Sequence, residues 1–132
     1  DMVKAMPTIV NIVFKRVRKR WTLILSSLVA TAFTNAFTSN QSATSFIIGD
    51  AFKPAYDKLK VSRKVLSRSI EDYGTMIETL IPWHASSLYV VATLGVSFAD
   101  YWHWQLLTII NLIIAPLLAI TGIGCFYKKK NK

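Results

Sequence analysis

A dense run of small polar side chains, residues 34–45, interrupts an otherwise apolar part of this chain. The apolar stretch 21–33 precedes the run, and an apolar triplet, 46–48, follows it. In a lipid interior each unpaired amide or hydroxyl group costs roughly several kcal/mol, so such a run must contact protein or line a water-filled cavity. Helices are interrupted in this way where membrane transporters bind ions and substrates, because the freed carbonyls and helix ends become ligands. The run therefore predicts a binding site within a membrane transporter.

Five neutral side chains in this run are suited to binding a dehydrated hard cation or a carboxylate substrate, because hard cations prefer oxygen ligands. They are Asn35, Ser39, Asn40, Gln41 and Ser42. The alternative is that they form hydrogen bonds with neighbouring helices, as small polar residues do in membrane bundles. Their density over eight positions favours a binding role.

A second group of candidates carries negative charge. Glu71, Thr75 and Glu78 are spaced i, i+4, i+7, which predicts that they share one face of a helix, and Asp72 lies beside that face. Acidic residues near membrane segments mark ion or proton routes, and one carboxylate can hold either a proton or a cation. The alternative is that Glu71 and Asp72 only pair with Arg68 at the cytoplasmic surface.

A histidine lies beside a predicted helix break. Pro82 ends a helix, and His84 follows two positions later, where it can relay protons or act as a structural hydrogen-bond donor. The sequence has no nucleophile–base pattern, phosphate-binding loop or metal-ligand motif. We therefore expect neither an enzyme nor a cofactor, and no metal beyond a transported ion.

Composition and charge point to a membrane protein. Of the 132 residues, 52% are hydrophobic, and the net charge is nevertheless +9. All sixteen Lys and Arg residues fall in the blocks 4–20, 53–68 and 128–132. Cytoplasmic loops of membrane proteins carry such an excess of cations, so all three blocks are expected in the cytoplasm. A nucleic-acid partner is not expected, because it would not explain the apolar spans between the blocks.

The fold class expected is all-α, a polytopic helical membrane protein with broken or re-entrant helices that forms part of a transporter bundle. The whole chain, 1–132, reads as one membrane domain. Its expected parts are a basic cytoplasmic approach (1–20), a broken-helix unit (21–50), a cytoplasmic connection (51–64), helices broken at Pro82 (65–99), a last transmembrane helix (105–127) and a cytoplasmic tail (128–132).

An ordered series of motifs resembles the C-terminal half of NhaC-type sodium/proton antiporters over roughly residues 21–127. The motifs are T-N-A-F-T-S-N-Q (34–41), I-G-D-A-F-K-P-A-Y (48–56), L-S-R-S-I-E-D-Y-G-T (66–75), L-I-P-W (80–83) and A-T-L-G-V (92–96). The resemblance implies a secondary transporter of the bacterial inner membrane that exchanges sodium for protons, and some family members resemble malate/lactate exchangers.

The resemblance also implies site residues. Asn35, Ser39 and Gln41 fall in its broken-helix motif, Glu71, Asp72 and Thr75 in its E-D-x-G-T motif, and Pro82 and Trp83 in its P-W motif. The chain departs from the family at His84, where Asn is frequent, and near Asn40, where Gly or Asp is common. These departures bear on the transported species more than on the fold.

The expected partners are the sodium ion, the proton, membrane lipid and the missing N-terminal half of the transporter. The first alternative is malate-proton/sodium-lactate exchange, in which Asn40, Ser42 and His84 face a small dicarboxylate or lactate. The second is a membrane scaffold that does not transport. We expect a multi-pass protein with a cytoplasmic C-terminus, and we expect that this chain alone does not transport.

Overall fold

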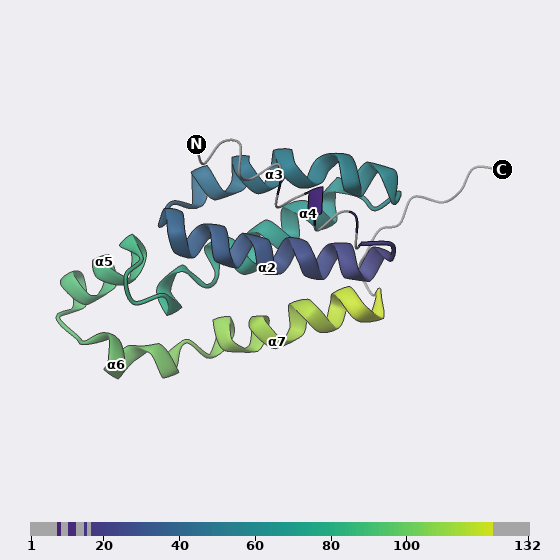
Figure 1. The fold of residues 1–132 in the computed structure, drawn as a ribbon. Helices are drawn as coiled ribbons and strands as arrows, with labels where there is room; N and C mark the ends of the chain where they lie inside the picture. Colours follow the sequence, from purple (N-terminus) through teal and green to yellow (C-terminus); the bar gives the residue numbers. More distant parts are fainter. Residues whose placement is uncertain (1–7, 9–10, 13–14, 16, 123–132) are drawn as a thin grey trace.

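The computed structural model describes residues 8, 11, 12, 15 and 17–122, and the described part from residue 20 onward is built from helices and short connections (Figure 1). The all-α prediction is confirmed. The elements are α2 (Arg20–Thr38), α3 (Gln41–Lys58), α4 (Arg63–Ile70), the π-helix η1 (Glu71–Thr75), the 3₁₀-helix η2 (Glu78–Leu80), α5 (Ala85–Leu94), α6 (Phe98–Tyr101), the 3₁₀-helix η3 (Trp102–Trp104) and α7 (Leu106–Thr121). The predicted tail, 128–132, and most of the predicted approach, 1–20, lie outside the described residues.

A two-residue break separates α2 from α3. Ser39 takes a left-handed conformation with φ 49°, and Asn40 is extended and accepts a hydrogen bond from the backbone N–H of Ala43 at 3.1 Å. Asparagine is a preferred helix N-cap, so Asn40 both ends the turn and starts α3. The chain reverses here, and α2 and α3 pack side by side (Figure 1). Most of the predicted polar break, 34–45, is thus helical, and the interruption itself is short.

The connection expected over 51–64 is corrected, because α3 continues to Lys58 and the true connection is 59–62. Charged side chains there stay on the exposed side of the helix, where Lys53 Nζ lies 2.9 Å from Asp50 Oδ1. Proline 54 is tolerated inside the helix, and its missing N–H removes the usual hydrogen bond to the Asp50 carbonyl.

The expectation that Glu71, Thr75 and Glu78 share one face of a helix is also corrected. After α4 the backbone widens into the π-helix η1, in which the N–H of Met76 donates to the Glu71 carbonyl at 3.2 Å, and then tightens into η2. Because a π-helix has more residues per turn than an α-helix, the i, i+4, i+7 spacing does not place Glu71, Thr75 and Glu78 on one α-helical face.

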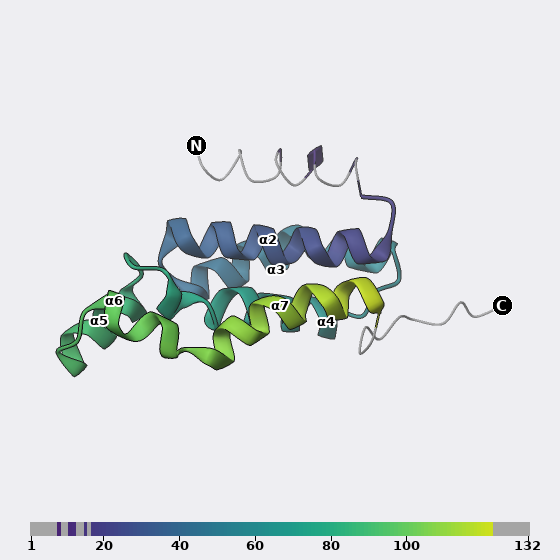
Figure 2. The same cartoon turned by 90° about the horizontal axis from the view of Figure 1, so that it is seen from below.

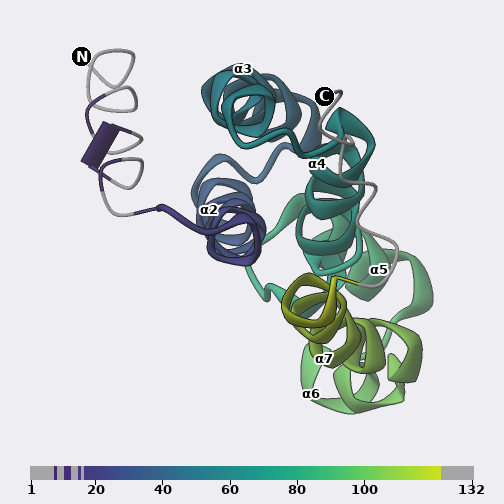
Figure 3. The ribbon, with the colours of Figure 1, turned by 90° about the vertical axis from the view of Figure 1, so that its right-hand side faces the viewer.

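Helix α2 lies at the centre of the packing and contacts α3, α4, η1 and α7 (Figure 3). Its buried side chains Leu23, Ile24 and Leu28 form one core with residues of the surrounding helices. Those residues are Ile48, Phe52 and Tyr56 from α3, Val61 from the connection, Val65 and Leu66 from α4, and Ala115 and Ala119 from α7. The two alanines lie in the C-terminal half of α7 and let that half approach α2 closely (Figure 2).

By length and composition, one described helix can cross a membrane, and two spans are possible if a bent pair counts as one. The single helix is α2, with 19 residues. The pair is Phe98–Trp104 with Leu106–Thr121, whose axes are bent by 56°. Proline 116 inside α7 leaves the Leu112 carbonyl without its helical donor, and the Tyr73 hydroxyl donates to that carbonyl at 2.7 Å.

Candidate functional site

A fully buried asparagine joins three separate parts of the chain. The Asn35 side-chain amide donates to the Gly74 carbonyl in η1 at 2.9 Å. Its Oδ1 atom lies 3.4 Å from Thr44 Oγ1 of α3 and 3.4 Å from His84 Nε2, just before α5. We call Asn35, Thr44, Gly74 and His84 the Asn35 cluster. It brings the predicted residues Asn35 and His84 together, although 49 positions separate them.

Thr44 is the member that the sequence interpretation missed. It is fully buried, and its hydroxyl oxygen lies 2.9 Å from Thr38 Oγ1 and 2.9 Å from the Asn40 carbonyl oxygen. A hydroxyl has one proton to donate, so the Asn40 carbonyl and Asn35 Oδ1 compete for it, whereas the Thr38 hydroxyl can donate to Thr44 instead. Thr44 falls inside the polar run 34–45, and its spacing of four after Asn40 on the same helix was the available indication.

His84 is buried, and both of its ring nitrogens make polar contacts. Its Nδ1 accepts the backbone N–H of Ser86 at 3.2 Å and so caps the start of α5. In the neutral imidazole one nitrogen accepts and the other donates, so Nε2 carries the proton and points at Asn35 Oδ1. The cap explains why a histidine beside Pro82 is held inside the protein.

The carbonyls of the π-helix region are bound by three carboxamide side chains from three other helices. Asn35 of α2 donates to Gly74, Gln41 of α3 donates to the Ile70 carbonyl at 3.3 Å, and Asn111 of α7 donates to the Asp72 carbonyl at 3.4 Å. Single π turns inside helices are frequent at functional sites, because they free backbone groups from the helical ladder.

Gln41 packs directly against Gly74. A Cβ atom added at Gly74 would collide with the Gln41 carboxamide, so a larger residue at this position requires the Gln41 side chain to move. The carboxamide oxygen, Oε1, is buried and is the one such side-chain atom in the described part of the chain that has no hydrogen-bond partner. An acceptor in that position is suited to a cation or a further donor.

The predicted carboxylates do not converge on one point. Asp72 Oδ2 lies 3.9 Å from Arg68 Nε, and Asp72 Oδ1 lies 3.4 Å from Asn111 Nδ2. Glu78 Oε2 accepts a hydrogen bond from Ser86 Oγ at 2.5 Å, whereas Glu71 is exposed on the α3 side of the molecule. Glu78 is linked to the Asn35 cluster through Ser86, whose hydroxyl donates to Glu78 and whose backbone N–H donates to His84.

The remaining predicted residues lie at the edge of the cluster. Ser39 forms the turn, Asn40 caps α3, and Ser42 and Thr75 are exposed. Within the described residues no group of three or more His, Cys, Asp or Glu side chains is placed to hold a metal ion. The oxygen atoms of the cluster are neutral, and neutral oxygens suit a cation that binds reversibly.

Comparison with known proteins agrees with this arrangement. The model of the Na+/H+ antiporter family matches residues 1–123. The chain is 35% identical over 108 residues to the Na(+)/H(+) antiporter NhaC of Bacillus subtilis, which covers 82% of this chain and 23% of that protein. It is 31% identical over 117 residues to NhaC of Alkalihalophilus pseudofirmus, with 89% of this chain and 25% of that protein covered.

Another relative, named for a different exchange, is the malate-2H(+)/Na(+)-lactate antiporter of Bacillus subtilis. It is 27% identical over 131 residues, which cover 99% of this chain and 28% of that protein. No solved structure matches significantly. The chain spans about a quarter of the length of these relatives. These matches confirm the resemblance to NhaC-type antiporters, and this chain belongs to the Na+/H+ antiporter family.

Proposed function

We propose that this chain forms part of the cation pathway of a sodium/proton antiporter, and that the Asn35 cluster holds the transported sodium ion. The observation that carries the proposal is the fully buried Asn35, whose Oδ1 faces Thr44 and His84 between three elements. Asn35 contacts the buried His84, and ionisable residues inside a membrane bundle mark substrate or ion paths. The family and the NhaC relatives supply the ion and the exchange mode.

The proposed site works by replacing the hydration shell of the ion. Asn35 Oδ1, Thr44 Oγ1 and the unpartnered Gln41 Oε1 are neutral oxygens on α2 and α3, the two helices that flank the Ser39–Asn40 break. The contacts of Asn35 Oδ1 with Thr44 Oγ1 and His84 Nε2 are long, at 3.4 Å, so a cation that binds Asn35 Oδ1 displaces weak hydrogen bonds rather than strong ones. Glu78 and Asp72 are the proposed proton carriers.

The test is proton flux in everted membrane vesicles that contain this chain joined to the missing part of the transporter, followed with a pH-sensitive dye. Sodium alone, lithium alone, and malate together with lactate are added in turn. A response to sodium alone supports the antiporter. A response only with the organic acids supports the carboxylate exchanger.

The carboxylate exchanger remains the second candidate because the malate/lactate antiporter of Bacillus subtilis is a relative. That reading requires Asn40, Ser42 and His84 to face one carboxylate. The geometry favours sodium instead, since His84 is buried against Asn35 while Asn40 and Ser42 are exposed at the start of α3.

The chain alone is proposed to be inactive, because it spans about a quarter of its relatives and so supplies only part of a binding site. Vesicles that contain only this polypeptide are expected to show no sodium-dependent proton flux, and robust flux would contradict this. A non-transporting scaffold is the remaining alternative. It predicts that Asn35→Ala or Glu78→Gln leaves the flux of the full assembly unchanged, whereas a transport site predicts near-complete loss.

We propose a multi-pass arrangement in the bacterial inner membrane with the C-terminus in the cytoplasm. The support is the distribution of the sixteen Lys and Arg residues into three blocks that border apolar segments. A reporter enzyme fused after Lys132 tests the arrangement. A reporter enzyme that is active only in the cytoplasm is expected to be active when it is fused at that position.

A further inference from the structure

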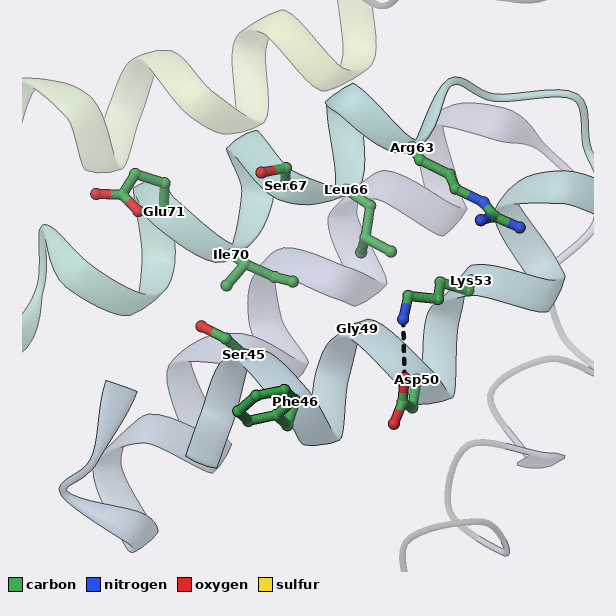
Figure 4. A pocket seen from close by; sticks show the side chains of 10 residues that line it. All are labelled: Ser45, Phe46, Gly49, Asp50, Lys53, Arg63, Leu66, Ser67, Ile70 and Glu71. Atoms are coloured by element: carbon green, nitrogen blue, oxygen red, sulfur yellow. Dashed lines mark hydrogen bonds and ion pairs between the residues drawn. The ribbon is translucent and has the colours of Figure 1, made fainter. Parts of the chain in front are cut away.

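An open groove of about 370 Å³ runs between α3 and α4, away from the Asn35 cluster (Figure 4). Its floor is apolar, with Phe46 and Gly49 from α3 and Leu66 and Ile70 from α4. Its rim is polar and charged, and it comprises Ser45, Asp50, Lys53, Arg63, Ser67 and Glu71. The groove therefore offers a partner an apolar strip between two rows of polar side chains.

Charged side chains of this groove lie on a helix that packs along a candidate membrane span. Helix α3 packs along α2, the helix that is long and apolar enough to cross a membrane, and Asp50 is nine residues, or about 14 Å, into α3. The side chains of Asp50 and Lys53 are 75% and 49% exposed. Charged groups that face lipid are unfavourable, so this face of the molecule is poorly suited to lipid.

The opposite side of the molecule has the reverse character. Viewed end-on, α3 and α7 lie on opposite sides of α2 and α4, and α6 lies beyond α7 (Figure 3). The exposed face of α7 is aliphatic, with Ile110, Ile113, Ile114 and Leu117 at 42–61% exposure and no charged residue anywhere in the helix. That face is suited to lipid, which leaves the α3–α4 groove as the side that needs protein.

Charge pairing indicates what the partner must carry. Asp50 is paired with Lys53, and Asp57 is held by Arg63, whose Nε and Nη2 donate to the two carboxylate oxygens at 3.2 and 2.5 Å. The Glu71 carboxylate, in contrast, makes no hydrogen bond or ion pair with any residue in the described part of the chain. It is the group left to be neutralised from outside.

We propose that the α3–α4 groove seats a membrane helix from the part of the antiporter that this chain does not cover, and that this helix carries a basic side chain opposite Glu71. The inference rests on the proposed function, in that it takes the chain to be part of a larger antiporter. About three quarters of the length of the relatives has no counterpart here and must pack against this chain somewhere. Gly49 has nothing within 4 Å of an added Cβ position, so a partner helix can approach the groove floor closely.

Photocrosslinking of the assembled complex tests the position of the partner. The full chain, with Cys125→Ser, is co-expressed with the part of Bacillus subtilis NhaC that it does not match, and single cysteines are labelled with benzophenone maleimide. Ser67→Cys in the groove is expected to give an adduct with the mass of both polypeptides. The matched control Ile113→Cys, on the aliphatic face of α7, is expected to give none.

Three results would overturn the proposal. One is an adduct at Ile113→Cys and none at Ser67→Cys. The second is an adduct of twice the mass of this chain, which would assign the groove to a second copy. The third is full labelling of Ser67→Cys in the complex by a membrane-impermeant maleimide, which would show that the groove is open to water.

Charge reversal tests the partner of Glu71. Glu71→Lys is expected to lower co-purification of the two polypeptides at least tenfold, and Glu71→Gln to lower it less. Lys64→Glu reverses an exposed charge on α4 that does not line the groove, and it is expected to have no effect. Equal recovery of Glu71→Lys and Lys64→Glu would refute the basic partner.

Proton flux is measured in the same vesicles, so that a failure of the groove proposal can be distinguished from a failure of the proposed antiporter function. Crosslinking at Ser67→Cys without sodium-dependent flux would refute the antiporter function and leave the groove assignment intact. Flux without crosslinking would refute the groove assignment alone.

Discussion

At the scale of single residues, the site depends on amide and hydroxyl groups that are buried without charge. Asn35, Thr44 and His84 are each at most 2% exposed, and each contacts at least one of the others. A buried polar group that loses its partner costs about 1–3 kcal/mol, so these side chains are coupled to the fold as well as to a ligand. Substitutions there must be read with a stability measurement beside the transport measurement.

Asn35→Ala is expected to abolish sodium-dependent flux in the assembled transporter and to destabilise it by about 1–3 kcal/mol, because the Gly74 carbonyl loses its donor. Flux and thermal unfolding are measured on the same preparation. Asn11→Ala removes a carboxamide from an exposed position and serves as the control. Normal sodium-dependent flux in Asn35→Ala would remove this residue from the cation pathway.

Gly74→Ala and Gly49→Ala form a matched pair of changes. At Gly74 the new methyl group collides with the Gln41 carboxamide, whereas at Gly49 it meets nothing within 4 Å. Alanine in a helix is otherwise favoured over glycine by about 0.5–1 kcal/mol, so Gly49→Ala should be neutral or stabilising and Gly74→Ala destabilising. Thermal unfolding in detergent, followed by circular dichroism, compares the two, and equal midpoints would show that Gln41 moves aside freely.

At the scale of elements, the breaks could be predicted from sequence but their form could not. The polar run and Pro82 indicated where helices stop, and the structure has its turns at 39–40 and at 81–84. The π-helix η1 was not predictable, because its carbonyls are satisfied by Asn35, Gln41 and Asn111 from distant helices. Periodicity assumes an α-helix, so it misplaced the face that carries Glu71 and Glu78.

The same limit applies to the site. Asn35 and Gln41 were predicted from the polar run and His84 from its place beside Pro82, and all three form polar contacts with distant parts of the chain. Thr44 was missed because a threonine in a helix is ordinary until its neighbours are known. The end of α3 was missed because ion pairs such as Lys53–Asp50 allow a charged segment to remain helical.

A double-mutant cycle tests how η1 is fastened to α7. Tyr73→Phe leaves the Leu112 carbonyl without the donor that replaces the N–H missing at Pro116, and it is expected to cost about 1–3 kcal/mol. In a Pro116→Ala background the helical N–H returns, so the same change should cost less. Thermal unfolding of the four variants gives the coupling, and an additive cycle would show that the tyrosine and proline act independently.

At the scale of the whole molecule, two faces are suited to different surroundings. The exposed side chains of α7 are aliphatic, and those of the α3–α4 groove include charged groups. The overall composition does not distinguish the two faces, because it averages over both. It shows only that 52% of the residues are hydrophobic and that the net charge is +9. Their separation in space follows from the packing of α3 and α7 on different sides of α2.

A lysine placed on each face distinguishes their surroundings. Ile113→Lys is expected to reduce membrane integration of the assembled protein by about 3 kcal/mol, because the charge enters lipid. Ser67→Lys, on the groove side, should change integration little, since that side already holds charged residues. The inserted fraction is measured by glycosylation of an engineered site, and equal losses at both positions would show that both faces contact lipid.

The contact between Trp83 and α2 gives the molecule a built-in optical reporter. The Trp83 indole N–H donates to the Ala36 carbonyl at 2.8 Å, yet the side chain is 63% exposed. Any movement that separates the end of α2 from the loop before α5 must break this bond. With Trp21, Trp102 and Trp104 replaced by Phe, a shift in emission wavelength on adding sodium would therefore report the position of the helix break during transport, without any attached dye.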